Sequence, residues 1–432
     1  MRILFLTCPG RTHLYSFVPL AWALQTAGHQ VRVASQLDAT NLTAADIAHT
    51  GLPAVVIGDE LDTSAMLAEA QQKAAAEGKA SDAPPPPPPA PAGPRRRPAQ
   101  REYAAEDPYA ELDGLARQHF PFFNSPSVID GAVRYARRWR PDLVIWDTMT
   151  MAYAGPVAAQ AVGAAHARFV FGADALGQLR IAAQHQGDPL RAALEPILDQ
   201  YGLAYNEHTL TGHWSIFPMP TWTWTPPGMD YLWMRPVPYN GPSVVPDWVL
   251  DEQERKRVCI TLGVTFRELD AGASTSDLLE AVADLDAEVV VTLGRDPAEL
   301  PTLPANVRAV DFVPLAALLP SCSAVVHHGG YGTFATALEH GVPQLVVPGK
   351  FGNDRFWGPY AYLPHMEDEG AAVYVSDHDQ LTPDVLHDSL QRVLKDPAFG
   401  RNAARMGALS AALPTPNDSV PAIERLTAHY RS

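Results

Sequence analysis

Residues 324–348, AVVHHGGYGTFATALEHGVPQLVVP, have types and a spacing that suit the binding of a charged ligand. An apolar run leads into His327 and His328, then into three closely spaced glycines and Thr333, and a helical pattern follows. Glycine lets the backbone approach a ligand, and the start of a helix offers unbonded N–H groups and a positive dipole end. The stretch therefore predicts a turn that holds a diphosphate, with a histidine and the Thr333 hydroxyl as side-chain donors. The alternative is a tight strand-to-helix corner with no ligand.

This turn matches neither of two common nucleotide-binding patterns. It is not a GxGxxG sequence, and no GK[ST] follows its glycines as a Walker A loop requires. Dinucleotide-dependent enzymes and P-loop NTPases are therefore disfavoured.

Two further polar residues follow apolar runs elsewhere in the chain. His13 comes after the run RILFLTC at residues 2–8, and Asp147 comes directly after DLVIW at residues 142–146. Both runs are typical of buried strands in a parallel sheet, whose ligand sites lie at the carboxyl ends of the strands. Both residues therefore stand where a site is expected. The alternatives are a surface histidine before a helix and an aspartate that caps the next helix.

The elements around these residues alternate between strand and helix patterns. Residues 2–8 read as a strand, 14–27 as a helix ended by Gly28, and 30–35 as a second strand. Such βαβ units build parallel sheets with helices on their faces. The pattern returns later, with a helix at 130–139, a strand at 142–146 and a helix at 148–163.

A second alternating series fills the C-terminal part of the chain. Before it, residues 212–248 are rich in proline and tryptophan without a sustained period, which indicates a linker between domains. The series has strand patterns at 257–262, 287–293, 307–312, 324–328 and 344–348, and helix patterns at 276–285 and 333–340. We therefore predict an α/β protein of two Rossmann-like βαβ domains. The predicted bounds are 1–235 and 253–415, with a linker at 236–252 and a last helix in 416–432, for which docking on the N-terminal domain is one of two alternatives.

Residues 62–118 interrupt the first series. Helix formers at 64–79 lead into six consecutive prolines at 84–89, and an arginine triplet follows at 95–97. A proline run cannot join a helix or a sheet interior and favours an extended polyproline II form. We therefore interpret the region around 80–100 as a solvated insertion loop, with a partner-docking PxxP segment as the alternative.

Composition excludes several classes of protein. The 432 residues include 32 Lys and Arg against 48 Asp and Glu, a formal net charge of −16, and 47% are hydrophobic. General binders of nucleic acid or anionic membranes are disfavoured, because phosphates would be repelled. Three cysteines are too few and too scattered for a disulfide framework or a zinc cage. No apolar stretch reaches 18 residues, so we expect a soluble, cytoplasmic protein.

The signature at 324–348 resembles the donor site of the GT-B glycosyltransferases of antibiotic biosynthesis, which use nucleotide sugars. The segments HLYSFVPLAWALQTAGHQVRVAS, RPDLVIWD, YNGPSVVPDWV and VCITLGV are similar to the same family in the same order. The resemblance is strongest to the desosaminyltransferase-type subgroup, which transfers deoxysugars or aminodeoxysugars to macrolide or anthracycline-type polyketides. It implies the GT-B fold, in which two Rossmann-like domains face each other across a cleft.

The resemblance also implies roles for the candidate residues. His13 matches the general base that deprotonates the acceptor hydroxyl, a task that suits an imidazole with an ordinary pKa of about 6.5. Asp147 matches a carboxylate that orients this histidine. The donor-side candidates are His327, His328, Gly330, Gly332, Thr333, Gly263 and Thr265 for the diphosphate, Val313 for the nucleotide base, and Asn353 and Asp354 for the sugar hydroxyls. His328 matches the family's diphosphate ligand better than His327, whose alternative is to face the core or the acceptor.

The expected donor is a dTDP-sugar. Relatives with ribonucleotide donors carry a Glu eight residues after the phosphate-binding histidine, where this chain has Thr336. The missing carboxylate suits a deoxyribose; alternatively, Thr336 makes no contact with the ligand. Because helix dipoles and side chains neutralise the diphosphate in this fold, we expect no cofactor and no required metal. The aromatic residues at 214–224 either line the acceptor pocket or pack in the core.

Three functions follow from these observations. The first is an inverting transferase that moves a deoxysugar from a dTDP-sugar to a polyketide hydroxyl. The alternatives are a sugar-nucleotide epimerase or hydrolase of the same fold, and a non-catalytic partner, which would be expected to lose His13 or the glycine turn. The resemblance further implies a haem-less cytochrome-type activator protein as a partner. The aglycone, the choice of O- or C-linkage and a homodimer stay open.

Overall fold

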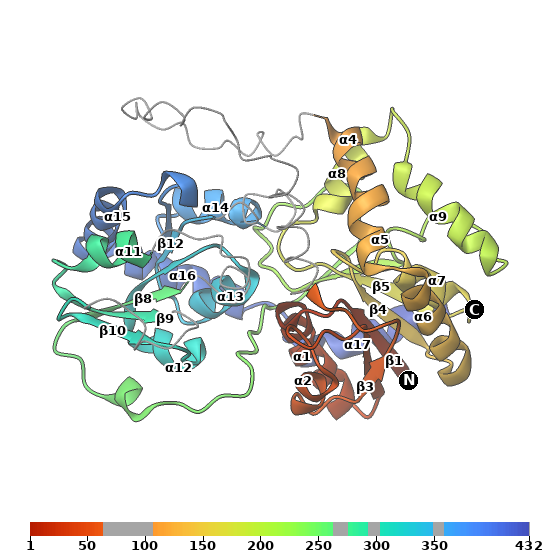
Figure 1. Cartoon of the computed structure of the whole chain (residues 1–432), viewed down its shortest axis with the longest axis horizontal. Coiled ribbons are helices and arrows are strands. Elements are labelled where there is room, and N and C mark those ends of the chain that lie inside the picture. The colour runs from red at the N-terminus through yellow and green to blue at the C-terminus, as the bar shows by residue number, and fades with distance from the viewer. Residues whose placement is uncertain (64–106, 262–274, 293–302, 349–357, 432) are drawn as a thin grey trace.

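The structure, a computed structural model, has two α/β lobes, each built on one sheet (Figure 1). It describes residues 1–63, 107–261, 275–292, 303–348 and 358–431. Within these ranges every pairing between the named strands is parallel. The predicted α/β class with two Rossmann-like domains is confirmed.

The first lobe holds a seven-stranded sheet in the order β3-β2-β1-β4-β5-β6-β7. The strands are β1 (Arg2–Thr7), β2 (Gln30–Ser35), β3 (Ala54–Val56), β4 (Leu143–Asp147), β5 (Ala165–Phe169), β6 (Trp214–Phe217) and β7 (Tyr231–Trp233). The order changes direction between β1 and β4, which pair with Phe5 opposite Ile145. In such sheets a crevice forms beyond the carboxyl ends of the two strands. His13 follows one of these strands, and Asp147 ends the other.

Helices cover both faces of this sheet. Alternate residues of β1 point to opposite faces, so Ile3 and Phe5 join one core and Leu4 and Leu6 the other. The helices are α1 (Arg11–Thr26), α2 (Ala44–His49), α4 (Pro108–Gly114), a π-helix (Leu115–His119), α5 (Phe120–Phe123), α6 (Pro126–Trp139), α7 (Ala154–Gln160), α8 (Ala175–Ala183) and α9 (Pro189–Gln200). A short 3-10 helix, Asp247–Leu250, follows the sheet.

Two predictions for this lobe are corrected. Helix α1 begins at Arg11 and not at residue 14, because the Gly10 carbonyl already accepts hydrogen bonds from the N–H groups of His13 and Leu14. The segment interpreted as a linker contributes β6 and β7, whose backbone groups bond to neighbouring strands despite the nearby prolines. The insertion predicted around 80–100 lies outside the described residues. After it, α4 and the π-helix bury Leu112 and Leu115 in the core.

The second lobe holds a six-stranded sheet in the order β10-β9-β8-β11-β12-β13. Its strands are β8 (Lys256–Thr261), β9 (Ala287–Thr292), β10 (Val307–Val310), β11 (Cys322–His327), β12 (Gln344–Val346) and β13 (Ala372–Tyr374). The order changes direction between β8 and β11, so the glycine turn after β11 lies at the switch point of this sheet.

Helices and short 3-10 segments also cover the second sheet. They are α11 (Thr275–Val282), α12 (Leu315–Leu318), α13 (Tyr331–Glu339), α14 (Leu363–Asp368), α15 (Pro383–Lys395) and α16 (Ala398–Ala411), with 3-10 helices at Leu319–Ser321, Pro359–Ala361 and His378–Gln380. In the part of the chain that the structure describes, none of the helices combines the length and the apolar character that a membrane crossing requires.

The last helix, α17 (Pro416–Tyr430), returns to the first lobe, as the blue ribbon in Figure 1 shows. Its Val420 and Ile423 enter the core that contains Leu14 of α1. A further apolar cluster joins the lobes, with Phe217 of β6 and Phe334 of α13 among its buried members. The two switch points are thus held in one packed molecule.

Candidate active site

His13 and Asp147 form a hydrogen-bonded pair at the switch point of the first sheet. Nδ1 of His13, in the first turn of α1, lies 2.6 Å from Oδ2 of Asp147 at the end of β4. The Asp147 side chain is 0% exposed, and it also accepts hydrogen bonds from Met149 N (2.9 Å) and the Thr150 hydroxyl (2.7 Å). Because a carboxylate only accepts, Nδ1 carries the proton and Nε2 is the basic nitrogen of the ring. Asp147 is not the cap of α7, which begins seven residues later.

The surroundings of His13 favour its protonated form. Burial by itself lowers the pKa of His13, but Cys8 and the Asp147 carboxylate raise it, and the resulting pKa lies well above the ordinary value. A carboxylate in this position stabilises the imidazolium that forms when the ring accepts a proton. The side chain of His13 is 16% exposed, so the ring reaches the surface while its partner stays buried. In its neutral state, the ring can accept a proton from a bound hydroxyl at Nε2, and Asp147 stabilises the imidazolium that forms.

The glycine turn at the second switch point forms an anion-binding helix start. Gly329 has a φ of 97°, and an added Cβ would lie 2.8 Å from Pro359, so only glycine fits there. Helix α13 begins after Gly330 with no side-chain cap, and its first backbone bond runs from Phe334 N to Gly330 O. The N–H groups of Gly332 and Thr333 lie in this first turn, where no helical acceptor is available. A Cβ added at exposed Gly332 would meet nothing within 4 Å, so the approach is open.

His328 lies beside this helix start. An added Cβ at Gly330 would be 2.4 Å from Nε2 of His328, so the ring packs directly against the Gly330 backbone. Burial lowers the pKa of His328 to about 4, which leaves a neutral imidazole at neutral pH. A neutral ring carries one N–H donor, and this suits a hydrogen bond to a phosphate oxygen. Thr333, the third residue of α13, is buried beneath the same turn.

His327 does not belong to this set, and its predicted contact with the diphosphate is corrected. Its ring is fully buried, with Nε2 donating to Oε1 of Gln344 (2.9 Å) and Nδ1 accepting from Gly329 N (3.0 Å). Burial, together with the neighbouring His328, lowers the pKa of His327 to about 3. Both ring nitrogens are used inside the protein, so His327 shapes the turn from the core side.

The structure describes some of the other donor-side candidates. Val313 follows β10, and its buried side chain packs in an apolar cluster with Cys259, Val290 and Leu318. Any contact of Val313 with a base would therefore come from its backbone. Thr336 is buried, and its hydroxyl donates to Gly332 O (2.7 Å) within α13. Gly263, Thr265, Asn353 and Asp354 lie outside the described residues.

One aromatic ring connects the two switch points. Phe171, just beyond β5, packs its ring edge-on against His13 at 5.4 Å and lies 5.6 Å from the ring of Tyr331. Tyr331 is the first residue of α13, and its hydroxyl donates to Pro218 O (3.2 Å) in the first lobe. The imidazole–carboxylate pair thus faces the helix start across Phe171. Phe171 and Thr150 were not predicted from the sequence, although both lie just beyond a strand's carboxyl end.

A small apolar cavity of about 20 Å³ opens beside Asp147 in the first lobe. Its lining residues come from the π-helix, the start of α5, the loops after β4 and β5 and the start of α8: Leu115, His119, Phe120, Thr148, Met149, Val170, Ala173, Ala175 and Leu176. His119 donates from Nε2 to Met149 O (2.6 Å), which ties the π-helix to the loop that follows Asp147. In the 214–224 segment, Trp214 and Phe217 are buried in the core, and the partly buried Trp222 stacks on His365 of α14.

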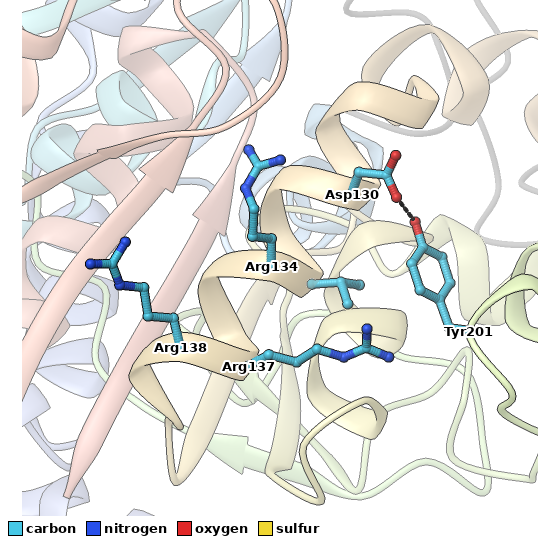
Figure 2. A pocket seen from close by; sticks show the side chains of 6 residues that line it. Asp130, Arg134, Arg137, Arg138 and Tyr201 are labelled. Carbon is cyan, nitrogen blue, oxygen red and sulfur yellow. Dashed lines mark hydrogen bonds between the residues drawn. The ribbon is translucent and has the colours of Figure 1, made fainter.

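A second pocket, of about 490 Å³, lies over α6 (Figure 2). Arg134, Arg137 and Arg138 extend from this helix, and Asp130 accepts a hydrogen bond from the Tyr201 hydroxyl. The pocket shares no residue with the His13–Asp147 pair or the glycine turn. It therefore offers control positions outside the site.

Solved glycosyltransferases share this fold over the whole chain. The structure of glycosyltransferase VinC in complex with dTDP has a TM-score of 0.81 and 37% identity, over 99% of this chain and 100% of that one. The spinosyn forosaminyltransferase SpnP has a TM-score of 0.77 and 34% identity, with 99% of both chains covered. The protein is therefore a glycosyltransferase with the GT-B fold.

Sequence comparison identifies the family. Residues 22–263 match the N-terminal domain, and residues 276–426 the C-terminal domain, of the proteins described as erythromycin biosynthesis protein CIII-like, and the chain belongs to this family. It is 43% identical to the aclacinomycin-T 2-deoxy-L-fucose transferase of Streptomyces galilaeus, over all of this chain and 97% of that protein. It is 40% identical to the 10-deoxymethynolide desosaminyltransferase of Streptomyces venezuelae, over all of this chain and 98% of that protein. The resemblance found in the motifs is confirmed.

Proposed function

We propose that the protein is an inverting glycosyltransferase that moves a deoxysugar from a dTDP-sugar to a hydroxyl of a polyketide aglycone. One observation carries the proposal: the hydrogen-bonded His13–Asp147 pair faces the start of α13 across a single ring, Phe171. A base and an anion-binding helix start on opposite sides of one aromatic ring suit a reaction in which a proton leaves one reactant and a diphosphate leaves the other. The names of the relatives, a 2-deoxy-L-fucose transferase and a desosaminyltransferase, support a deoxysugar as the transferred group.

The dTDP donor is supported by two observations. The related structure of VinC is a complex with dTDP. In this chain Thr336 is buried and bonded to its own helix, so α13 offers no carboxylate to a ribose 2′-hydroxyl at that position. A deoxyribose has no such hydroxyl and loses nothing by this arrangement.

The proposed reaction proceeds in one displacement. Nε2 of His13 accepts the proton of the acceptor hydroxyl, and the oxygen attacks the anomeric carbon on the face opposite the nucleotide. The bond to the diphosphate breaks as the new bond forms, which inverts the anomeric carbon. The first-turn N–H groups of α13 and the side chains of His328 and Thr333 take up the charge of the leaving diphosphate. Asp147 holds the His13 ring and stabilises its protonated form, and no metal is required.

The acceptor class is supported by the names of the relatives, one of which is a 10-deoxymethynolide desosaminyltransferase. These names favour a transferase over a sugar-nucleotide epimerase or hydrolase. Retention of both His13 and the glycine turn speaks against a non-catalytic partner.

Nucleotide titration and product analysis test the proposal. Calorimetry with dTDP, UDP and ADP should show selective binding of dTDP, and the product of a dTDP-deoxysugar and a polyketide aglycone should have the inverted anomeric configuration by NMR. Selective UDP binding would contradict the donor assignment, and a retained configuration would contradict the single displacement. The assay is run with and without a haem-less cytochrome-type helper, because an activator protein is one of the proposed partners. A homodimer is the other.

A further inference from the structure

Cys8 brings a third metal-binding side chain to the His13–Asp147 pair. One donor atom from each of Cys8, His13 and Asp147 lies within 4.8 Å of the other two. The three residues come from the end of β1, the first turn of α1 and the end of β4, so the switch point of the sheet assembles them. Cys8 is 4% exposed and Asp147 is fully buried, while His13 reaches the surface.

The donors converge for an identifiable reason. An added Cβ at Gly10 would lie 3.2 Å from Cδ2 of His13 and 3.4 Å from Sγ of Cys8, so thiol and imidazole meet over the bare backbone of Gly10. Asp147 is held in place by Met149 N and the Thr150 hydroxyl. Such outer hydrogen bonds orient the carboxylate oxygens and are a common feature of metal sites.

The donor set fits a thiophilic cation. Thiolate, imidazole and carboxylate are the ligands of Zn²⁺, and three protein ligands with one open position are typical of reactive zinc sites. Bond lengths of about 2.0–2.3 Å place the donors of a tetrahedral site roughly 3.3–3.6 Å apart. The His13 and Asp147 donors, now 2.6 Å apart, must therefore separate by up to about 1 Å, and donors as far apart as the 4.8 Å limit must approach by about 1 Å. Side-chain rotation supplies both movements. Hard cations such as Mg²⁺ prefer oxygen ligands and do not suit the thiol.

We propose that Cys8, His13 and Asp147 form a binding site for a thiophilic divalent cation such as Zn²⁺, and that the bound cation inhibits sugar transfer. On binding, the S–H bond of Cys8 breaks and its proton passes to solvent, and the proton on Nδ1 of His13 moves through solvent to Nε2, so that the ring stays neutral. The sulfur, Nδ1 of His13 and a carboxylate oxygen of Asp147 then donate electron pairs to the cation, with no change of oxidation state. The inhibitory part rests on the proposed function, because a coordinated imidazole no longer accepts the acceptor's proton in its productive geometry.

Metal binding to the full chain is measured first, without turnover. Zn²⁺ is titrated by calorimetry, and Cd²⁺ by the ultraviolet thiolate-to-metal charge-transfer band. The test variants are Cys8→Ser, which keeps the shape and removes the soft donor, and Asp147→Asn. The matched control is Cys322→Ser, which removes a partly exposed thiol from the second lobe. Near-ultraviolet circular dichroism confirms that each variant is folded.

We expect one cation per chain, with a thiolate band in the native protein and in Cys322→Ser. Cys8→Ser should lose the band and weaken Zn²⁺ binding by more than the roughly 10- to 100-fold that loss of an outer hydrogen bond costs. Unchanged binding in Cys8→Ser, or loss of the band in Cys322→Ser, would overturn the site.

Turnover is measured second, with Zn²⁺ added and then removed by a chelator. Reversible inhibition in the native protein, reduced in Cys8→Ser relative to that variant's own metal-free rate, supports the inhibitory role. Bound Zn²⁺ with unaltered turnover would overturn that role. A failure of the proposed function is distinguishable, because it abolishes dTDP-sugar turnover without metal and leaves the binding titrations unaffected.

Discussion

Replacing Asp147 by asparagine removes the charge beside His13 and preserves the shape of the side chain. The carboxylate is fully buried and lies 2.6 Å from Nδ1 of His13, so solvent does not weaken the hydrogen bond. A hydrogen bond to a charged group contributes about 1.5–3 kcal/mol, and about 1.36 kcal/mol corresponds to a tenfold change in rate. Asp147→Asn should therefore lower the rate of the chemical step by roughly 10- to 150-fold.

Removal of the imidazole sets the upper limit of this effect. His13→Ala should lower the rate by about 10²- to 10⁴-fold, as expected for loss of a general base. Because Asp147 acts through the His13 ring, Asp147→Asn should cost little more when His13 is already alanine. Affinity for dTDP should change less than about twofold in each variant, because the glycine turn belongs to the other sheet.

The assay is a single-turnover measurement with saturating dTDP-sugar and acceptor, paired with calorimetric titration of dTDP. Asp130→Asn is the matched control, since that carboxylate bonds to the Tyr201 hydroxyl in the pocket over α6 (Figure 2). The control should retain the native rate. Fully additive losses in the double variant, or a native rate in Asp147→Asn, would refute the role of Asp147 as the positioning residue of the base.

Three further predictions concern the donor turn, acid stability and a buried ion pair. Gly332→Ala should not lower the thermal unfolding temperature, because the added Cβ meets nothing within 4 Å and alanine favours a helix, yet it should weaken dTDP binding about tenfold where a phosphate approaches; unchanged affinity in calorimetry would contradict the assignment. The pKa of His327 is lowered to about 3, first by burial and then by the adjacent histidine, whereas an unfolded histidine titrates near about 6.5. The unfolded chain therefore binds the proton first, so the free energy of unfolding should be constant above a pH of about 6.5 and decrease as the pH falls toward about 3, with a shallower decrease in His327→Gln by urea unfolding. Arg168→Met should lower the free energy of unfolding by about 3–5 kcal/mol, because it leaves the buried Asp174 without its 2.8 Å partner; exposed Arg134→Ala should stay within about 0.5 kcal/mol.

Much of the candidate site could be predicted from local sequence. Apolar runs fix which segments become buried strands, and parallel βαβ units place ligands at the carboxyl ends of those strands. His13 was therefore noted from its position, and the resemblance to the family added Asp147 and the roles of both residues. The run of glycines after β11 likewise predicted the turn. The structure shows why a glycine is needed there, because Gly329 has a φ of 97° and an added Cβ would contact Pro359.

Other features could not be read from the sequence, because they depend on residues far apart in the chain. The strand pairing of β6 and β7 overrode the proline and tryptophan content that suggested a linker. His327 and His328 look equivalent in sequence, but Gln344, 17 residues away, accepts a hydrogen bond from His327 and holds it in the core. The local pattern contains no information on that partner.

The sequence by itself determined the elements, the strand ends that carry candidate residues and the glycines of the turn, because these depend on neighbours along the chain. Only the tertiary structure decided which of these residues meet. The His13–Asp147 hydrogen bond joins residues 134 apart in sequence, and it exists because β1 and β4 pair at the switch point. Phe171 comes between His13 and Tyr331 only when the two lobes pack together. Cys8 joins the pair because β1, α1 and β4 meet at the switch point, where thiol and imidazole lie close to the Gly10 backbone.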